Sequence, residues 1–127
     1  MFEKLELTRM AQAMAAQAGT RMGLISENVA NADTPNYKAQ DLASFADTYA
    51  SVGTEMRATR PGHFNSADHA IAPQLRQDKD AGSPNGNTVS LEQEMVKAAG
   101  VRQDHEMALA IYRNTSEIIR ASLGRSR

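Results

Sequence analysis

The chain has 127 residues and a formal net charge of −1, from 14 basic and 15 acidic side chains. This balance gives no general attraction to nucleic acid or to an anionic membrane surface, and the length suits a single domain. Alanine supplies 21 of the apolar residues, whereas Val, Ile, Leu and Phe are scarce. We therefore expect a chain that is marginally stable alone and needs partners to bury its helices.

The sequence contains no cysteine, which excludes disulfides, thiolate metal sites and cysteine nucleophiles. Residues 1–7 mix charges of both signs and contain no long apolar run, so they match neither a cleaved signal peptide nor a membrane span. We therefore expect no direct membrane insertion. If the protein leaves the cytoplasm, we expect a route without a cleaved signal peptide.

The first element expected is a long helix over residues 5–32. Its apolar side chains recur at intervals of three and four residues, as one stripe of an α-helix requires. At about 1.5 Å per residue, this helix would be about 40 Å long, more than a compact domain of this size usually needs. The residues of this stripe expected to mediate assembly are Leu7, Met14, Ile25 and Val29.

The helical pattern ends in a specified turn. Pro35 disfavours the helical conformation at Thr34, which we expect to be extended. Asp33 is placed to close a side-chain turn onto the backbone after it, and Asn36 tolerates a positive φ better than other non-glycine residues. The residues assigned to the turn are Asn31, Asp33, Thr34, Pro35, Asn36 and Tyr37.

The segment after the turn predicts little regular structure. Phe45 and Tyr49 lie in a weakly amphipathic stretch that favours a short helix. From residue 50 to residue 87, Pro, Gly, Asn and Asp are frequent and no periodicity persists, which is typical of turns. Because a structureless segment of this length is uncommon in a compact domain, we expect a functional loop or a segment ordered only against neighbours.

A second long helix is expected to begin after Ser90. Ser90 and Gln93 form a capping-box pattern, and acidic residues in the first turn suit the positive end of the helix dipole. The assembly stripe expected on this helix consists of Leu91, Met95, Leu109, Tyr112 and Ile119. Neither long helix can bury its apolar face alone, so we expect them to pack on each other and on copies or relatives.

These patterns predict an all-α fold in which two long terminal helices form an antiparallel, coiled-coil-like pair. The expected divisions are a core helix at 1–33, the turn with a short helical segment and an irregular outer loop at 34–87, and a second core helix at 88–127.

The turn reads Ala30-Asn31-Ala32-Asp33-Thr34-Pro35-Asn36-Tyr37. It resembles the Ala-Asn-x-x-Thr-Pro-Gly-Tyr signature that follows an N-terminal helix in the flagellar basal-body rod and hook family. Asn36 replaces the usual glycine, and asparagine is the residue best able to keep the same backbone bend. Similarity to the proximal-rod members of the family rests on the short length, Asp41-Leu42, and Gly86-Asn87-Thr88-Val89 before Leu91-Glu92-x-Glu94-Met95.

The resemblance implies a structural subunit of the rod that crosses the periplasm, assembled helically to transmit torque from the inner-membrane ring. It also implies export by the flagellar type III apparatus without a cleaved signal peptide. The terminal helices would form the inner tube, with the middle segment further out. The implied partners are copies of the chain, other rod proteins, the inner-membrane ring, the rod-base adaptor and the export apparatus. Phe45 and Tyr49 resemble the Phe-x-x-x-hydrophobic export-gate signal of early flagellar subunits.

Other functional classes match the sequence less well. A soluble helical adaptor or a secreted coiled-coil interaction protein would share the two stripes, but it would not need the turn. No pattern indicates catalysis, a cofactor or a metal site, since His63, His69 and His105 lack the paired spacing of such sites. The one enzymatic alternative is phosphotransfer at His105, and the adjacent Asp104 and Glu106 would repel an anionic phosphoryl group.

Overall fold

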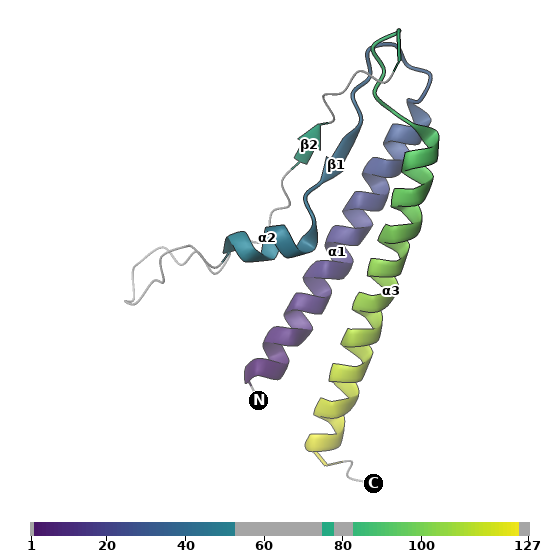
Figure 1. Cartoon of the computed structure of the whole chain (residues 1–127). Coiled ribbons are helices and arrows are strands. Elements are labelled where there is room, and N and C mark those ends of the chain that lie inside the picture. The colour runs from purple at the N-terminus through teal and green to yellow at the C-terminus, as the bar shows by residue number, and fades with distance from the viewer. Residues whose placement is uncertain (1, 53–74, 78–82, 125–127) are drawn as a thin grey trace.

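The computed structural model describes residues 2–52, 75–77 and 83–124. In chain order its elements are helix α1 (Phe2–Ala30), strand β1 (Gln40–Leu42), helix α2 (Phe45–Val52), strand β2 (Leu75–Gln77) and helix α3 (Leu91–Ser122). Helices α1 and α3 run antiparallel and side by side, so that the two ends of the chain lie at the same end of the pair (Figure 1). The predicted pair of long terminal helices is confirmed.

Most buried residues of this helix pair recur every seven positions. They are Ala11, Ala18 and Ile25 on α1, and Glu94, Val101, Ala108 and Thr115 on α3, while Gln17 and Asn28 of α1 are buried outside this repeat. A seven-residue repeat corresponds to 3.5 residues per turn, which keeps the contact line facing the partner when two helices coil with a left-handed twist. The apolar centre consists of Ala18, Ile25 and Val101, with Met22 and Ala98 packed against it.

The core of the helix pair is narrow. Three of the five buried apolar residues described on α1 and α3 are alanine. Small side chains let two helices approach closely, but they bury little apolar area, and each Å² buried contributes only about 25 cal/mol. The structure therefore agrees with the marginal stability expected from composition. Within the same described ranges, no helix is long and apolar enough to cross a membrane.

A small two-stranded sheet and α2 lie beside α1 (Figure 1). The strands pair antiparallel, with Leu42 opposite Leu75. The sequence analysis did not predict these strands, because three residues are too few to show a clear alternation. The expected short helix is present as α2, and Ser44 caps it by accepting a hydrogen bond at Oγ from the Asp47 N–H (3.2 Å).

The long helices begin and end close to the predicted positions. Helix α1 ends at Ala30, two residues before the predicted end at Ala32. Ser90 caps α3 as predicted, with its Oγ accepting from the Gln93 N–H at 3.5 Å. Most of the predicted irregular segment, at residues 53–74 and 78–82, lies outside the described residues.

Two valines on α3 allow a matched test of the buried contact between α1 and α3, which we call the seam. Val101 is 2% exposed and Val96 is 74% exposed. Val101→Ala should lower the free energy of unfolding by about 2 kcal/mol, because it removes buried methyl groups and leaves a cavity. Val96→Ala should change it by less than about 0.5 kcal/mol. Urea unfolding followed by circular dichroism, with sucrose to secure a folded baseline, measures both; equal effects would contradict this seam.

Candidate functional site

The chain leaves α1 through a tight turn. The Asn31 N–H lies 3.1 Å from the carbonyl oxygens of both Glu27 and Asn28, and the Asn31 Nδ2 donates to the Glu27 carbonyl at 2.8 Å. Next, the Thr34 N–H donates to the Asn31 carbonyl at 3.0 Å, and the Tyr37 N–H donates to the Thr34 carbonyl at 3.3 Å. The turn is thus closed by its own backbone together with one asparagine side chain.

Asn36 and Gly86 meet at the tip of this turn. Asn36 has a φ of 61°, which confirms the predicted positive φ, and its N–H donates to the Asn85 carbonyl at 3.0 Å. Gly86 has a φ of 78°, and a Cβ atom there would lie 2.5 Å from Asn36 Oδ1. Position 86 therefore needs glycine for its backbone conformation, since a Cβ atom there would only displace the exposed end of the Asn36 side chain.

Asn87, which lies four residues before α3, contacts the turn with its side chain. It is 2% exposed, and its Nδ2 lies 3.0, 2.8 and 2.9 Å from the carbonyl oxygens of Asn31, Ala32 and Thr34. Its Oδ1 accepts from the Val89 N–H at 2.7 Å. Carbonyl groups just past a helix end have no partner within the helix. The two N–H groups of this buried amide thus lie within reach of three carbonyls. Among the described residues, those of Asn31 and Thr34 also accept from backbone N–H groups, whereas that of Ala32 does not.

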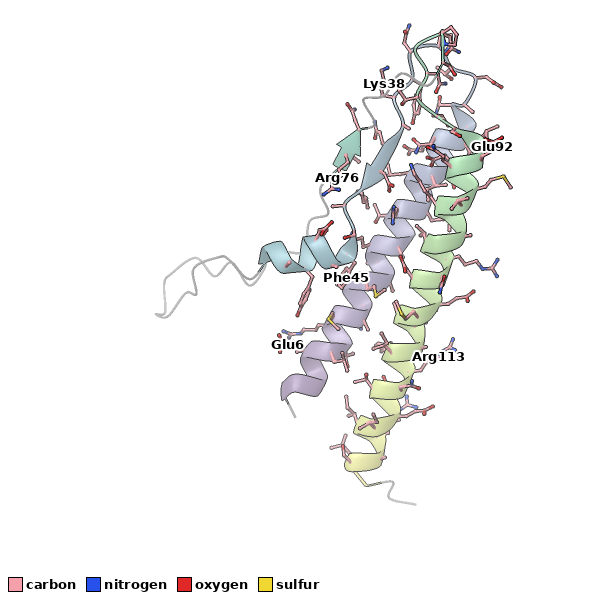
Figure 2. All side chains as sticks on the ribbon, viewed as in Figure 1. Glu6, Lys38, Phe45, Arg76, Glu92 and Arg113 are labelled. Atoms are coloured by element: carbon pink, nitrogen blue, oxygen red, sulfur yellow. The ribbon has the colours of Figure 1, made fainter. Side chains whose placement is uncertain are left out.

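Beyond the turn, the chain at residues 37–39 runs beside the chain at residues 86–88. The Thr88 N–H donates to the Tyr37 carbonyl at 3.1 Å, and Thr88 Oγ1 accepts from the Ala39 N–H at 2.8 Å. Lys38, which lies near this end of the molecule in Figure 2, donates from Nζ to the Gly86 carbonyl at 2.9 Å. We call the group formed by Asn36, Gly86, Asn87 and Thr88 the turn clamp.

Asn28 joins α1, β1 and α3 below the turn clamp. Its side chain is fully buried, and Nδ2 donates to the Gln40 carbonyl at 2.8 Å and to Glu94 Oε2 at 3.0 Å. Its Oδ1 accepts from the Gln40 N–H at 3.0 Å and from the Tyr37 hydroxyl at 3.5 Å. Both donors and both lone pairs are used, so this amide favours one relative placement of the three elements.

Asp41 on β1 lies between cations from both helices. Arg21 donates two hydrogen bonds to its carboxylate, at 2.6 and 2.9 Å, and Lys97 Nζ lies 3.8 Å from Asp41 and 2.8 Å from Glu94. Burial alone would raise the pKa of Asp41, but the Arg21 bonds, the Leu42 N–H and the two positive charges together lower it. Ionised Asp41 therefore fastens β1 to α1 and α3.

Comparison with known proteins supports the resemblance in the turn. Residues 9–38, which include most of α1 and the turn, match a family profile described as flagella basal body rod protein. Flagellar basal body rod protein FlgB of Cereibacter sphaeroides is 33% identical over 94 residues, covering 72% of this chain and 73% of the relative. FlgB of Agrobacterium fabrum is 22% identical over 118 residues, covering 88% of each chain.

The chain belongs to the FlgB family of flagellar basal body rod proteins. It is accordingly a structural subunit of the basal body rod and not an enzyme. Within the described residues, no three His, Asp or Glu side chains are grouped to hold a metal ion.

In this FlgB-family chain, the six predicted turn residues form one compact structure, but one predicted interaction is wrong. Asp33 was expected to close a side-chain turn. It is exposed, and no described group donates a hydrogen bond to its carboxylate. The side-chain contact within the turn comes from Asn31 instead, because its Oδ1 accepts a hydrogen bond from the Thr34 hydroxyl at 3.2 Å. Pro35 is exposed and acts only through the backbone restriction it imposes.

Sequence reasoning did not identify Asn28, Asn87 and Glu94 as site residues. All three are at most 2% exposed. A signal was available at Asn28, because asparagine is a poor helix former and sits here among alanines near a helix end. Glu94 gave no such signal, since a glutamate in the first turn of a helix is common on surfaces.

The predicted assembly stripes lie partly beside the contact between the helices. On α1, Ile25 is buried and Met14 is half-buried, whereas Leu7 and Val29 are exposed. None of the α3 residues of the stripe is fully buried. Leu91, Met95 and Tyr112 are exposed, and Leu109 and Ile119 are half-buried. Glu94 faces inward, where Asn28 of α1 donates to it at 3.0 Å, and the next residue, Met95, points about 100° away around the helix and is exposed.

Asn36 tests the backbone requirement of the turn. Asn36→Gly should leave rod assembly intact, because glycine adopts the same positive φ freely. Asn36→Val should impair assembly, because a β-branched side chain strongly resists this conformation. Motility assays together with quantification of the subunit in purified basal bodies measure both variants. Equal assembly of the two would show that the positive φ is not required.

Asp41 should make the stability of the chain depend on pH. Because folding lowers its pKa, its contribution is complete above the ordinary aspartate pKa of about 3.9 and is lost as the pH falls toward the folded value. Asp41→Asn should lower stability at pH 7 and weaken the loss of stability between pH 5 and pH 3. Asp33→Asn, at an exposed carboxylate, is the control. Urea unfolding in sucrose across this range measures the effect, and parallel curves for the two variants would refute it.

Proposed function

We propose that this chain is a proximal-rod subunit that assembles helically through the sides of α1 and α3. In this proposal, residues 1–33 and 88–127 build the inner tube and residues 34–87 lie further out. The observation that carries the proposal is the set of large apolar side chains left exposed on α3 and at Leu123, the residue that follows it. Leu91, Met95, Val96, Met107, Tyr112, Ile118 and Leu123 are between 38% and 74% exposed.

The exposed apolar residues of α3 point in more than one direction. Met95 and Val96 are 72% and 74% exposed, and consecutive residues differ by about 100° around a helix axis. Val96, Met107 and Ile118 follow one another at intervals of about three turns and form one line along the helix. One neighbouring helix packs along one line, so this pattern favours two different neighbours. Contacts of this kind propagate into helical assemblies when they do not close into a ring.

The outer side of α1 offers a complementary surface. Ala16, Gly19, Gly23, Ser26 and Ala30 are exposed, and a Cβ atom at either glycine would meet no atom within 4 Å. Small residues permit close approach of a neighbouring helix, and the apolar lines of α3 carry the bulky side chains for such a contact. This match favours copies of the chain or related rod proteins as neighbours.

The remaining features of the proposal rest on the family membership. We infer that the chain resides in the basal body rod crossing the periplasm, where its partners include other rod proteins, the inner-membrane ring and the rod-base adaptor. Export would occur through the flagellar type III apparatus without a cleaved signal peptide. The turn clamp supports the inferred division, because it fixes the point at which the chain leaves the helix pair.

Met95 separates assembly from folding. Met95→Asp places a charge on an exposed site, so the helix pair should form while incorporation into rods falls at least about tenfold, because burying an unpaired carboxylate costs several kcal/mol. Met95→Leu, which keeps the surface apolar, should assemble normally. Helix content of the purified chain and its amount in isolated basal bodies are the two readouts. Normal motility with Met95→Asp would contradict the proposed contact.

We further propose that Phe45 and Tyr49 form the export-gate signal. Their ring centroids lie 5.8 Å apart on α2, and Tyr49 is 38% exposed whereas Phe45 is half-buried. Tyr49→Ala should therefore reduce the secreted amount of the chain without destabilising the helix pair. Ala46→Ser on the same helix is the control. Secretion should be measured by immunoblot in a strain arrested before rod completion, and unchanged secretion of Tyr49→Ala would eliminate this role.

A further inference from the structure

The loop before α3 contains the one Asn-Gly pair of the sequence, Asn85-Gly86. Asn85 is exposed, and Gly86 belongs to the turn clamp. In such a pair the backbone nitrogen of glycine attacks the side-chain amide carbon of asparagine with little hindrance, because no Cβ atom stands beside the nitrogen. Every other asparagine of the chain precedes a residue with a side chain and resists this attack more strongly.

The reaction needs only base and water. Base removes the proton of the Gly86 N–H, the nitrogen bonds to Asn85 Cγ, and the Cγ–Nδ2 bond breaks. Nδ2 takes up a proton and leaves as ammonia, and a five-membered succinimide ring remains. Water then opens the ring at one of its two carbonyl carbons. Opening at Cγ gives aspartate, whereas opening at the main-chain carbonyl gives isoaspartate, in which the chain runs through Cγ.

The closed turn holds these atoms in an arrangement that cannot form the ring. The Gly86 N–H donates to the Ser83 carbonyl at 2.9 Å, which closes a β-turn over residues 83–86. Because Pro84 is its second residue and Asn85, the third, lacks a positive φ, the turn is of type I, with a ψ of about 0° at Asn85. The ring needs Asn85 Cβ and the Gly86 nitrogen eclipsed about the Cα–C bond, a rotation of about 120° from this ψ.

Two more hydrogen bonds oppose that rotation. The Asn85 carbonyl accepts from the Asn36 N–H at 3.0 Å, and Asn85 Oδ1 accepts from the Asn87 N–H at 3.1 Å. Rotation about the Cα–C bond would turn the Asn85 carbonyl away from Asn36 and the Gly86 N–H away from the Ser83 carbonyl. The attack therefore requires the turn clamp to open first.

We propose that Asn85 is a deamidation site that the closed turn clamp protects and that opening of the clamp exposes to attack. Isoaspartate adds one carbon atom to the main chain directly before Gly86. Asn87 then no longer meets the carbonyl groups after α1 in the same register, so a clamp that has reacted does not close again. The proposal concerns the turn of the subunit and does not depend on rod assembly.

The test compares deamidation of the full-length chain in mildly alkaline buffer with sucrose and with urea, with circular dichroism to monitor the fold. Peptide mass spectrometry measures conversion at Asn85 and at Asn114, an exposed residue that precedes threonine. In urea, Asn85 should convert severalfold faster than Asn114. In sucrose, Asn85 should convert at least about tenfold more slowly than in urea, because only the open clamp reacts. Equal rates for Asn85 in the two solvents, or no conversion in urea, would overturn the proposal.

Variants separate the chemistry from the protection. In urea, Gly86→Ala should slow conversion severalfold, and an unchanged rate would show that the Gly86 nitrogen is not the attacking atom. In sucrose, Asn36→Val should speed conversion, whereas Asn36→Gly, which keeps the positive φ, should not. If Asn36→Val does not fold, the unmodified chain decides. Its conversion should rise together with hydrogen exchange at the Gly86 amide as sucrose is withdrawn, and a constant rate would refute protection by the clamp.

Asn85→Asp carries the charge of the product without the added carbon atom. It should regain its helix content when urea is replaced by sucrose, whereas chains that contain isoaspartate at position 85 should regain less. Equal recovery of the two would refute the inference that a clamp that has reacted stays open.

Discussion

The structure depends on supplying donors to the carbonyl groups where α1 ends. A helix that stops inside a protein leaves carbonyl oxygens without partners, and here the chain must also turn sharply. Asn87 meets this need from a position close to the start of α3. The Ala32 carbonyl, in the turn after the first helix, therefore gains its donor only when the segment before the last helix is in place. This reciprocity makes the antiparallel pairing of α1 and α3 specific despite its narrow alanine core.

The helix pair has two sides of different chemistry. On one side, Gln17, Arg21 and Asn28 of α1 bind the chain from Gln40 to Ala43, and Lys97 of α3 lies near the same strand. On α3, the seam turns Met95 and neighbouring apolar residues away from these contacts. Polar side chains thus hold the segment after the turn, while apolar ones on α3 stay exposed. In the proposed assembly this division matters, because a segment that packed on the apolar side would cover the surface proposed for neighbours.

The sequence predicted the parts of the fold that repeat and missed those that depend on single contacts. Two long helices were readable from periodicity over many turns, and the positive φ of Asn36 followed from the residues around Pro35. The burial of Glu94 was not readable, because it depends on its contact with Asn28, which lies 66 residues away in the chain. The strands were too short to show a pattern. The assembly stripe expected on α3 stays a prediction, and the structure leaves Leu91, Met95 and Tyr112 of that stripe exposed.

The turn clamp also determines how the chain is connected as a whole. The chain leaves the helix pair at Tyr37 and returns at Thr88, and these residues are joined by a hydrogen bond of 3.1 Å. Everything between them is topologically an insertion between two neighbouring points. Lengthening such an insertion costs little, since each doubling of a flexible loop adds only about 0.6 kcal/mol of closure entropy. The helix pair should therefore tolerate a change in the length of this insertion, provided that the Gln40–Ala43 stretch bound by α1 is kept.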